Sequence, residues 1–176
     1  MAISIALNHR PWLRAAIAVL ACIGAGFALA QSAELPNRSD ALEGVTTAGQ
    51  PSEAALAAIA AAGYKAVIDL RGPNEDRGLA DEKKTVEMLG MSYVNLPIEG
   101  AAGVSYANAR ALDKLLAEVG GPVLVHCTSS NRVGALLALR AKAIGTDAET
   151  ALEVGLASGL AGLKSLVEQK LGQGHD

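Results

Sequence analysis

Residues 123–134 decide the fold, and they read VLVHCTSSNRVG. The stretch opens with three apolar residues, two of them β-branched, which favours a strand covered on both faces. Residues 133–140 are VGALLALR, a composition that favours helix. The six residues from Cys127 to Arg132 are therefore predicted to form the turn that joins a buried strand to a helix.

A turn of this kind is a predicted anion site. It gathers successive backbone N–H groups around one point, and the helix that follows adds the positive end of its dipole. The guanidinium of Arg132 can hold an oxyanion through two parallel hydrogen bonds. The predicted anion-binding residues in the loop are Thr128, Ser129, Ser130, Asn131 and Arg132.

Cys127 is the candidate nucleophile. A helix N-terminus and a neighbouring cation favour the thiolate, which is the reactive form of cysteine. The alternative is a small apolar residue that fills the core at the end of a strand. We favour the nucleophile because polar side chains and Arg132 follow directly. Neighbours on a strand face opposite ways, so His126 is expected to point away from Cys127 and to orient the loop by hydrogen bonds, or to be a buried imidazole without a chemical role.

The start of the chain is predicted to be a secretory signal peptide, residues 1–30. Arg10 and Arg14 precede a long apolar run, and residues 28–30, ALA, match the small-residue cleavage pattern. The uncharged run is short of the roughly 20 residues that span a bilayer, so we expect no stable membrane insertion after cleavage. The expected location is the periplasm or the exterior of the cell.

The composition excludes several classes of function. The chain of 176 residues has 15 Lys and Arg against 18 Asp and Glu, and its leader would remove only basic residues, so no basic surface indicates nucleic acid binding. Outside the leader Cys127 is the only cysteine, which leaves no internal disulfide. The pattern offers no converging set of ligands for a metal, and we expect no cofactor.

Strands and helices alternate along the rest of the chain. This order predicts an α/β fold of three layers, with a mostly parallel central sheet of about four to five strands and helices on both faces. We assign residues 31–43 to a flexible leader and 44–172 to one domain. The predicted strands are residues 44–48, 65–70, 92–96 and the strand before Cys127, and the predicted helices include 53–62, 81–89 and 160–171.

Three segments together resemble a known family. They are residues 48–52 (AGQPS), residues 67–71 (VIDLR) followed by Glu75, and the loop from His126 to Arg132. The chain resembles the phosphatase-like domain of beta-lactamase hydrolase-like proteins, a branch of the tyrosine and dual-specificity phosphatase superfamily. The resemblance implies a phosphatase-like fold and a phosphocysteine mechanism, in which Cys127 attacks phosphorus and Arg132 binds the oxygens of a small anionic substrate or a phosphoprotein.

Two further charged residues are expected at the site. Superfamily phosphatases carry an acid about thirty residues before the cysteine, and Glu99, two residues after Pro97, is the candidate general acid; its alternative is a solvated loop carboxylate. Arg71 follows a predicted strand, so it is expected to add a second positive group to the anion site. The alternative for Arg71 is a surface ion pair with a nearby carboxylate.

The loop also departs from the superfamily pattern, and these departures leave other functions open. Four residues separate Cys127 from Arg132 where phosphatases of the broad superfamily have five. Six-residue loops occur in rhodanese-type sulfurtransferases, which carry a persulfide. Ser130 stands at the usual glycine and resists a positive φ, and Val133 replaces a hydroxyl. A sulfurtransferase or a non-catalytic anion-binding module therefore remains an alternative to a phosphatase. No oligomeric state is predicted.

Overall fold

The computed structural model describes residues 33–173. The predicted signal peptide lies outside the described residues. The described chain forms a five-stranded sheet in the order β1-β2-β5-β3-β4. β1 runs antiparallel to β2, whereas the pairs β2–β5, β5–β3 and β3–β4 are parallel. The strands are β1 Ser39–Leu42, β2 Val45–Ala48, β3 Ala66–Asp69, β4 Ser92–Asn95 and β5 Val123–His126.

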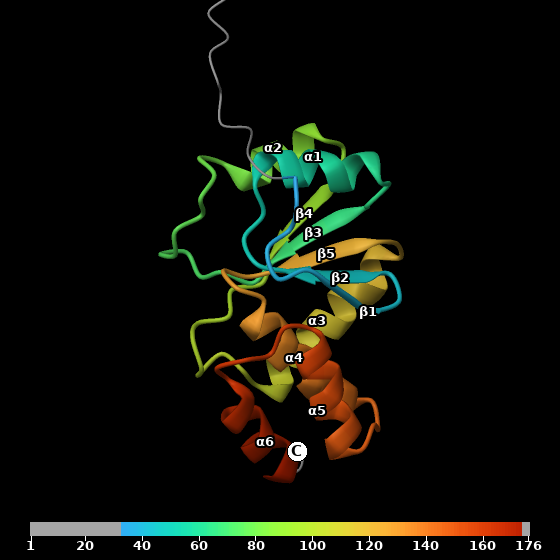
Figure 1. Ribbon diagram of the computed structural model, residues 1–176, viewed down its shortest axis with the longest axis vertical. Helices are drawn as coiled ribbons and strands as arrows, with labels where there is room; N and C mark the ends of the chain where they lie inside the picture. The colour runs from blue at the N-terminus through green and yellow to red at the C-terminus, as the bar shows by residue number, and fades with distance from the viewer. Residues whose placement is uncertain (1–32, 174–176) are drawn as a thin grey trace, which may run out of the picture. The chain divides into compact units, whose positions relative to one another are not determined.

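Helices cover both faces of the sheet. Figure 1 shows α1 and α2 on one face and α3, α4, α5 and α6 beyond the other. The predicted three-layer α/β fold is thus confirmed. No helix among residues 33–173 is both long and apolar enough to cross a membrane. The helices are α1 Glu53–Ala61, α2 Glu82–Met88, α3 Tyr106–Val119, α4 Asn131–Ala143, α5 Ala148–Ala157 and α6 Lys164–Gln173.

Polar residues that the sequence places before the apolar runs fix several helix starts. Ser52, Asp81, Ser105 and Asp147 each accept a hydrogen bond from a backbone N–H in the first turn of the helix that follows. Gly120 closes α3 in the left-handed conformation, with φ of 61°. Because these signals are local, the predicted positions of α1 and α2 agree with the structure to within a residue or two.

Two segments differ from their predicted structure. Residues 39–42, assigned to a flexible leader, form β1 and pair with β2. Their sequence, SDAL, lacks the alternation of a strand, so pairing with an existing sheet edge determines their conformation. The last helix begins at Lys164 and not near Leu160. The intervening turn is held by Asn131 of another helix, whose Oδ1 accepts hydrogen bonds from Ala161 N and Leu163 N.

β5 is the central strand and positions the loop that follows it. All four of its residues are buried. Val123 and Val125 pack in the core beneath α3 and α4, whereas Leu124 packs in the core beneath α1 and α2. Burial of an aliphatic side chain of this size contributes about 1.5–3 kcal/mol. The strand is therefore held from both faces, and Cys127 lies directly at its carboxyl end.

Candidate active site

The loop of residues 127–132 packs closely against the segment after β2. Gln50 N donates a hydrogen bond to Thr128 O at 3.2 Å, and Cys127 N donates to Ala48 O at 3.4 Å. A Cβ atom on Gly49 would lie 3.0 Å from Thr128 O, so a side chain there would press on the loop. This contact explains why the AGQPS segment, far away in sequence, belongs to the same site.

Ser130 adopts the left-handed backbone that its side chain was expected to resist. Its φ is 68°, and it occupies the N-cap position of α4. The side chain is fully buried, and its Oγ donates to Ser158 O at 3.1 Å. Gly159 leaves the necessary room, because a Cβ atom there would lie 2.5 Å from Ser130 Oγ. The hydrogen bond offsets a backbone strain of about 1–2 kcal/mol.

The side chains of Ser130 and Asn131 form hydrogen bonds with turns elsewhere in the fold. Ser130 bonds to the turn after α5, and the Asn131 carboxamide accepts hydrogen bonds from the turn before α6. Ser129 is exposed, and its backbone carbonyl oxygen accepts a hydrogen bond from Asn37 Nδ2 at 3.3 Å. Thr128 differs from these residues, because its hydroxyl forms hydrogen bonds with the charged side chains of Glu75 and Arg132. The side chains of Ser130 and Asn131 therefore anchor the loop. Binding of an anion by the backbone amides of residues 128–132 stays a prediction.

Arg132 forms a two-point ion pair with the carboxylate of Glu75. Its Nη1 lies 2.5 Å from Glu75 Oε1 and its Nη2 lies 2.6 Å from Glu75 Oε2. Nη1 also donates to Ile98 O at 2.8 Å, and Nη2 donates to Thr128 Oγ1 at 3.3 Å. Glu75 further accepts from Gly72 N at 2.7 Å and from Thr128 Oγ1 at 3.0 Å. The carboxylate thus occupies a cradle of four hydrogen-bond donors.

The electrostatics of this pair follow from the same contacts. The hydrogen bonds from Arg132 are the main reason that the pKa of Glu75 falls from 4.5 to about 2. The hydrogen bond with Glu75 raises the pKa of Arg132 in turn, and the interaction with Cys127 adds to the rise. Glu75, in the segment after β3, was not among the predicted site residues, although it belongs to one of the three segments that carry the family resemblance.

Cys127 is the first residue of the loop, directly after β5. Its side chain is 1% exposed and belongs to the core cluster on the α3 and α4 side of the sheet. The guanidinium of Arg132 is not turned into water, because its side chain is only 12% exposed and interacts with Cys127. The sulfur and the guanidinium are therefore neighbours, as the anion-site hypothesis requires.

Glu99 lies in the cleft next to Arg132. The cleft has a volume of about 510 Å³, and Glu99, Glu75, Gly72 and Arg132 are among the residues that line it. A Cβ atom on Gly72 would lie 3.8 Å from Glu99 Cγ, so the two loops that follow β3 and β4 meet here. The structure thus places Glu99 within the same cleft as Arg132, while its role as general acid stays a prediction.

Arg71 does not join the anion site. Its side chain is fully buried and donates from Nε to Asp69 Oδ1 at 2.9 Å, and from Nη2 to both Asp69 and Glu82. Burial alone lowers the pKa of Arg71, but hydrogen bonds and charges from Asp69 and Glu82 raise it overall. The expectation that Arg71 joins the anion site is wrong because side chains alternate between the two faces of a sheet along a strand. Leu70 packs toward α3 and α4, so Arg71 faces the opposite side.

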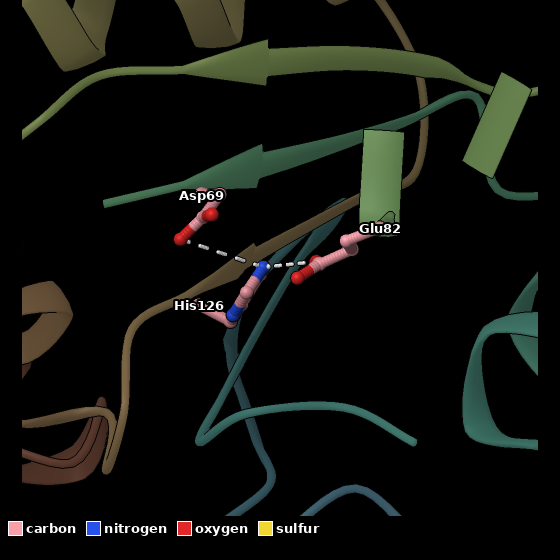
Figure 2. Close-up of side chains that lie close together, drawn as sticks. All are labelled: Asp69, Glu82 and His126. Carbon is pink, nitrogen blue, oxygen red and sulfur yellow. Dashed lines mark ion pairs between the residues drawn. The ribbon is translucent and has the colours of Figure 1, made fainter. Parts of the chain in front are cut away.

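His126 belongs to the same buried network and not to the loop. Figure 2 shows its ring directed toward Glu82 and Asp69, with Nε2 at 2.8 Å from Glu82 Oε1 and 3.8 Å from Asp69 Oδ1. Neither ring nitrogen makes a well-directed hydrogen bond within the described chain. The expectation that His126 faces away from Cys127 is confirmed. The expected hydrogen bonds from His126 to the loop are absent from residues 33–173.

Asp69, Glu82 and His126 are residues of the types that bind metals, and their ligand atoms lie within 4.8 Å of one another. Each carboxylate is already neutralised by an arginine, however. Arg71 bonds to both, and Arg77 bonds to Asp69. A divalent cation at this point would meet two guanidinium groups without excess negative charge, so these residues do not fit a metal. The cluster is better described as a buried ion-pair network that joins β3, β5 and α2.

Comparison with curated proteins supports a link to one group of bacterial proteins. The chain is 34% identical over 100 residues to a beta-lactamase hydrolase-like protein of Agrobacterium fabrum, covering 55% of this chain and 23% of that protein. It is 31% identical over 103 residues to one of Xylella fastidiosa, covering 57% and 24%. The chain therefore spans about a quarter of the length of these curated relatives.

Solved structures share the fold. One is a putative phosphatase of Neisseria meningitidis, with a TM-score of 0.64, 20% identity, and coverage of 79% of this chain and 99% of that chain. Another is TpbA of P. aeruginosa in complex with pTyr, with a TM-score of 0.58, 21% identity, and coverage of 75% and 80%. Residues 23–169 match the family described as "DSP-PTPase phosphatase fused to NAD+ Kinase". A match over most of the sequence, with the same fold, shows that the chain belongs to this phosphatase family.

Proposed function

We propose that the protein is a cysteine-dependent phosphatase that hydrolyses a phosphomonoester through a phosphocysteine intermediate on Cys127. One observation carries the proposal: next to Cys127, the guanidinium of Arg132 holds two oxygens of a carboxylate by two parallel hydrogen bonds. Two oxygens of a phosphoryl group present nearly the same arrangement to the fork of donors. Membership of a phosphatase family supports the same reaction.

In the proposed reaction the thiolate of Cys127 attacks phosphorus and the bond to the leaving oxygen breaks. Glu99, which lines the cleft beside Arg132, donates the proton that the leaving alcohol or phenol requires. Water then attacks the phosphocysteine, Glu99 takes its proton back from the water, and inorganic phosphate leaves with the thiolate restored. Arg132 and the amides at the start of α4 stabilise the negative charge on the transferred group in both steps.

A second candidate function is sulfur transfer through a Cys127 persulfide. It is favoured by the small size of the cradle. The loop has only six residues, and the side chains of Ser130 and Asn131 form hydrogen bonds with other turns of the fold. The terminal nitrogens of Arg132 are already bonded to Glu75. A single sulfur atom needs less space and fewer donors than a phosphoryl group. The third possibility, an anion-binding module without turnover, uses the same residues.

A paired assay distinguishes these functions. The protein and its Cys127→Ser variant are incubated with an aryl phosphate and, separately, with thiosulfate and cyanide. We expect phosphate release from the protein and none from the variant, because the hydroxyl is a far weaker nucleophile than the thiolate. Thiocyanate formation that depends on Cys127 would replace the phosphatase proposal by sulfur transfer. If neither reaction occurs, the result would favour the third possibility, an anion-binding module without turnover.

A further inference from the structure

The Glu75 carboxylate occupies the position that an anionic substrate needs. Its oxygens accept hydrogen bonds from Arg132 Nη1 and Nη2, from Thr128 Oγ1 and from Gly72 N. Two of these groups, Thr128 and Arg132, are the first and last members of the loop that follows Cys127. The protein therefore binds a carboxylate of its own chain with Arg132, the side chain that the proposed reaction assigns to a phosphoryl group.

The donors of Arg132 are already used in this arrangement. Nη1 donates to Glu75 and to Ile98 O, and Nη2 donates to Glu75 and to Thr128 Oγ1, so both terminal nitrogens have two partners. The charge of the guanidinium is also balanced by the carboxylate. An incoming phosphoryl group would meet an occupied fork and a like charge at close range, so the two anions exclude each other.

Glu75 has room to leave. It lies in the segment between β3 and α2, which contains no helix or strand and extends away from the sheet in Figure 1. Its side chain is 32% exposed and lines the cleft of about 510 Å³ that Glu99 also borders. Rotation of this one side chain into the cleft would free one N–H on each terminal nitrogen of Arg132 without unfolding a helix or a strand.

We propose that Glu75 is a specificity-determining residue, an internal carboxylate that an anionic substrate must displace from Arg132. The inference rests on the proposed phosphatase site but requires no turnover. Anions that offer two oxygens on one side, such as phosphomonoesters and inorganic phosphate, replace both hydrogen bonds that Glu75 gives up. Anions that offer a single contact do not, so Glu75 selects for anions that present two oxygens to the two terminal nitrogens of Arg132.

The test is the affinity for inorganic phosphate, measured by calorimetry in the Cys127→Ser background, where no reaction on sulfur contributes. Glu75→Gln keeps the size of the side chain but places an amide N–H₂ against the guanidinium. We expect this variant to bind phosphate at least about 10-fold more tightly, because the charge-assisted hydrogen bonds between Arg132 and Glu75 no longer compete with phosphate. Asp76→Asn is the matched control: it removes a charge from the adjacent, exposed residue, and the amide oxygen can still accept from Gly78 N. We expect its affinity to stay within about 2-fold, because exposed charges are screened.

Two outcomes would overturn the proposal. If Glu75→Gln binds phosphate no more tightly than its parent, or more weakly, the carboxylate positions Arg132 and does not compete with the substrate. If Asp76→Asn gains as much as Glu75→Gln, net charge alone explains the effect. A protein without phosphatase activity would still give a clear result, since only binding is measured.

A second measurement needs no variant. Gly72 N donates to Glu75 Oε1 at 2.7 Å, so the ¹⁵N and ¹H resonances of the Gly72 amide report on whether Glu75 is in place. On titration of the protein with inorganic phosphate, we expect this resonance to shift in step with saturation. Phosphate binding that leaves the Gly72 amide unchanged would show that Glu75 stays on Arg132, and the proposal would be wrong.

Discussion

Replacement of Gly134 by alanine should destabilise the protein, although alanine is the better helix former. Gly134 lies in the first turn of α4, just after the loop of Cys127, and within a helix this exchange favours folding by about 0.8–1 kcal/mol. The opposing effect is steric. A Cβ atom at position 134 would lie 2.3 Å from Leu160 N, 2.6 Å from Gly155 O and 2.8 Å from Leu160 Cα.

The steric effect is the larger one. All three contacts are with backbone atoms of α5 and the turn after it, so no side chain can rotate aside to make room. Overpacking in a core costs about 1–3 kcal/mol even where side chains adjust, and backbone contacts lie at the upper end. We therefore expect Gly134→Ala to lower the free energy of unfolding by about 2 kcal/mol net of helix propensity. That is a large part of the 5–15 kcal/mol typical of a domain.

The assay is urea denaturation with a matched control in another helix. Gly172 lies near the end of α6, and a Cβ atom there meets nothing within 4 Å, so Gly172→Ala should be neutral or stabilise by up to about 1 kcal/mol. A shift of α4 away from α5 would also disturb the turn that holds Ser130, so the proposed phosphatase activity should fall with stability. A Gly134→Ala protein as stable as the wild type would refute the close approach of the two helices.

Three further predictions follow from the buried and charged groups. Arg71→Met should lower the free energy of unfolding in urea by about 3–5 kcal/mol, because it leaves two buried carboxylates without their shared cation; a loss below about 1 kcal/mol would indicate a surface pair. Ser130→Ala should cost about 1–2 kcal/mol in the same assay, since it keeps the positive φ but loses the hydrogen bond to Ser158 O. For pH, the pKa of Glu75 is lowered to about 2, so its contribution to stability is fully present above about 4.5 and is lost as the pH falls toward 2. Thermal melts should show this part of the acid loss in the wild type and not in Glu75→Gln; equal acid profiles would contradict the strength of the ion pair.

Much of the fold could be predicted because its signals are local. Ser52, Ser105 and Gly120 act on the residues next to them in the chain, and the alternation of strands and helices leaves few possible topologies. Cys127 and Arg132 could be placed at one site for the same reason, since a single turn holds both. β1 could not be found, because residues 39–42 become a strand only when the edge of β2 is present to pair with them.

The sequence by itself therefore determined the layers, the central strand and the loop that joins Cys127 to Arg132. Tertiary structure alone decided which charged groups meet. Arg71 and Glu75 lie four residues apart, yet Arg71 is buried with Glu82 on one face of the sheet, whereas Glu75 reaches Arg132 at the carboxyl edge of the strands. Ser130 likewise finds its partner in the turn after α5. Ion pairs and hydrogen bonds of this kind form between segments far apart in the chain, and their energy depends on burial and distance, which only the packed fold defines.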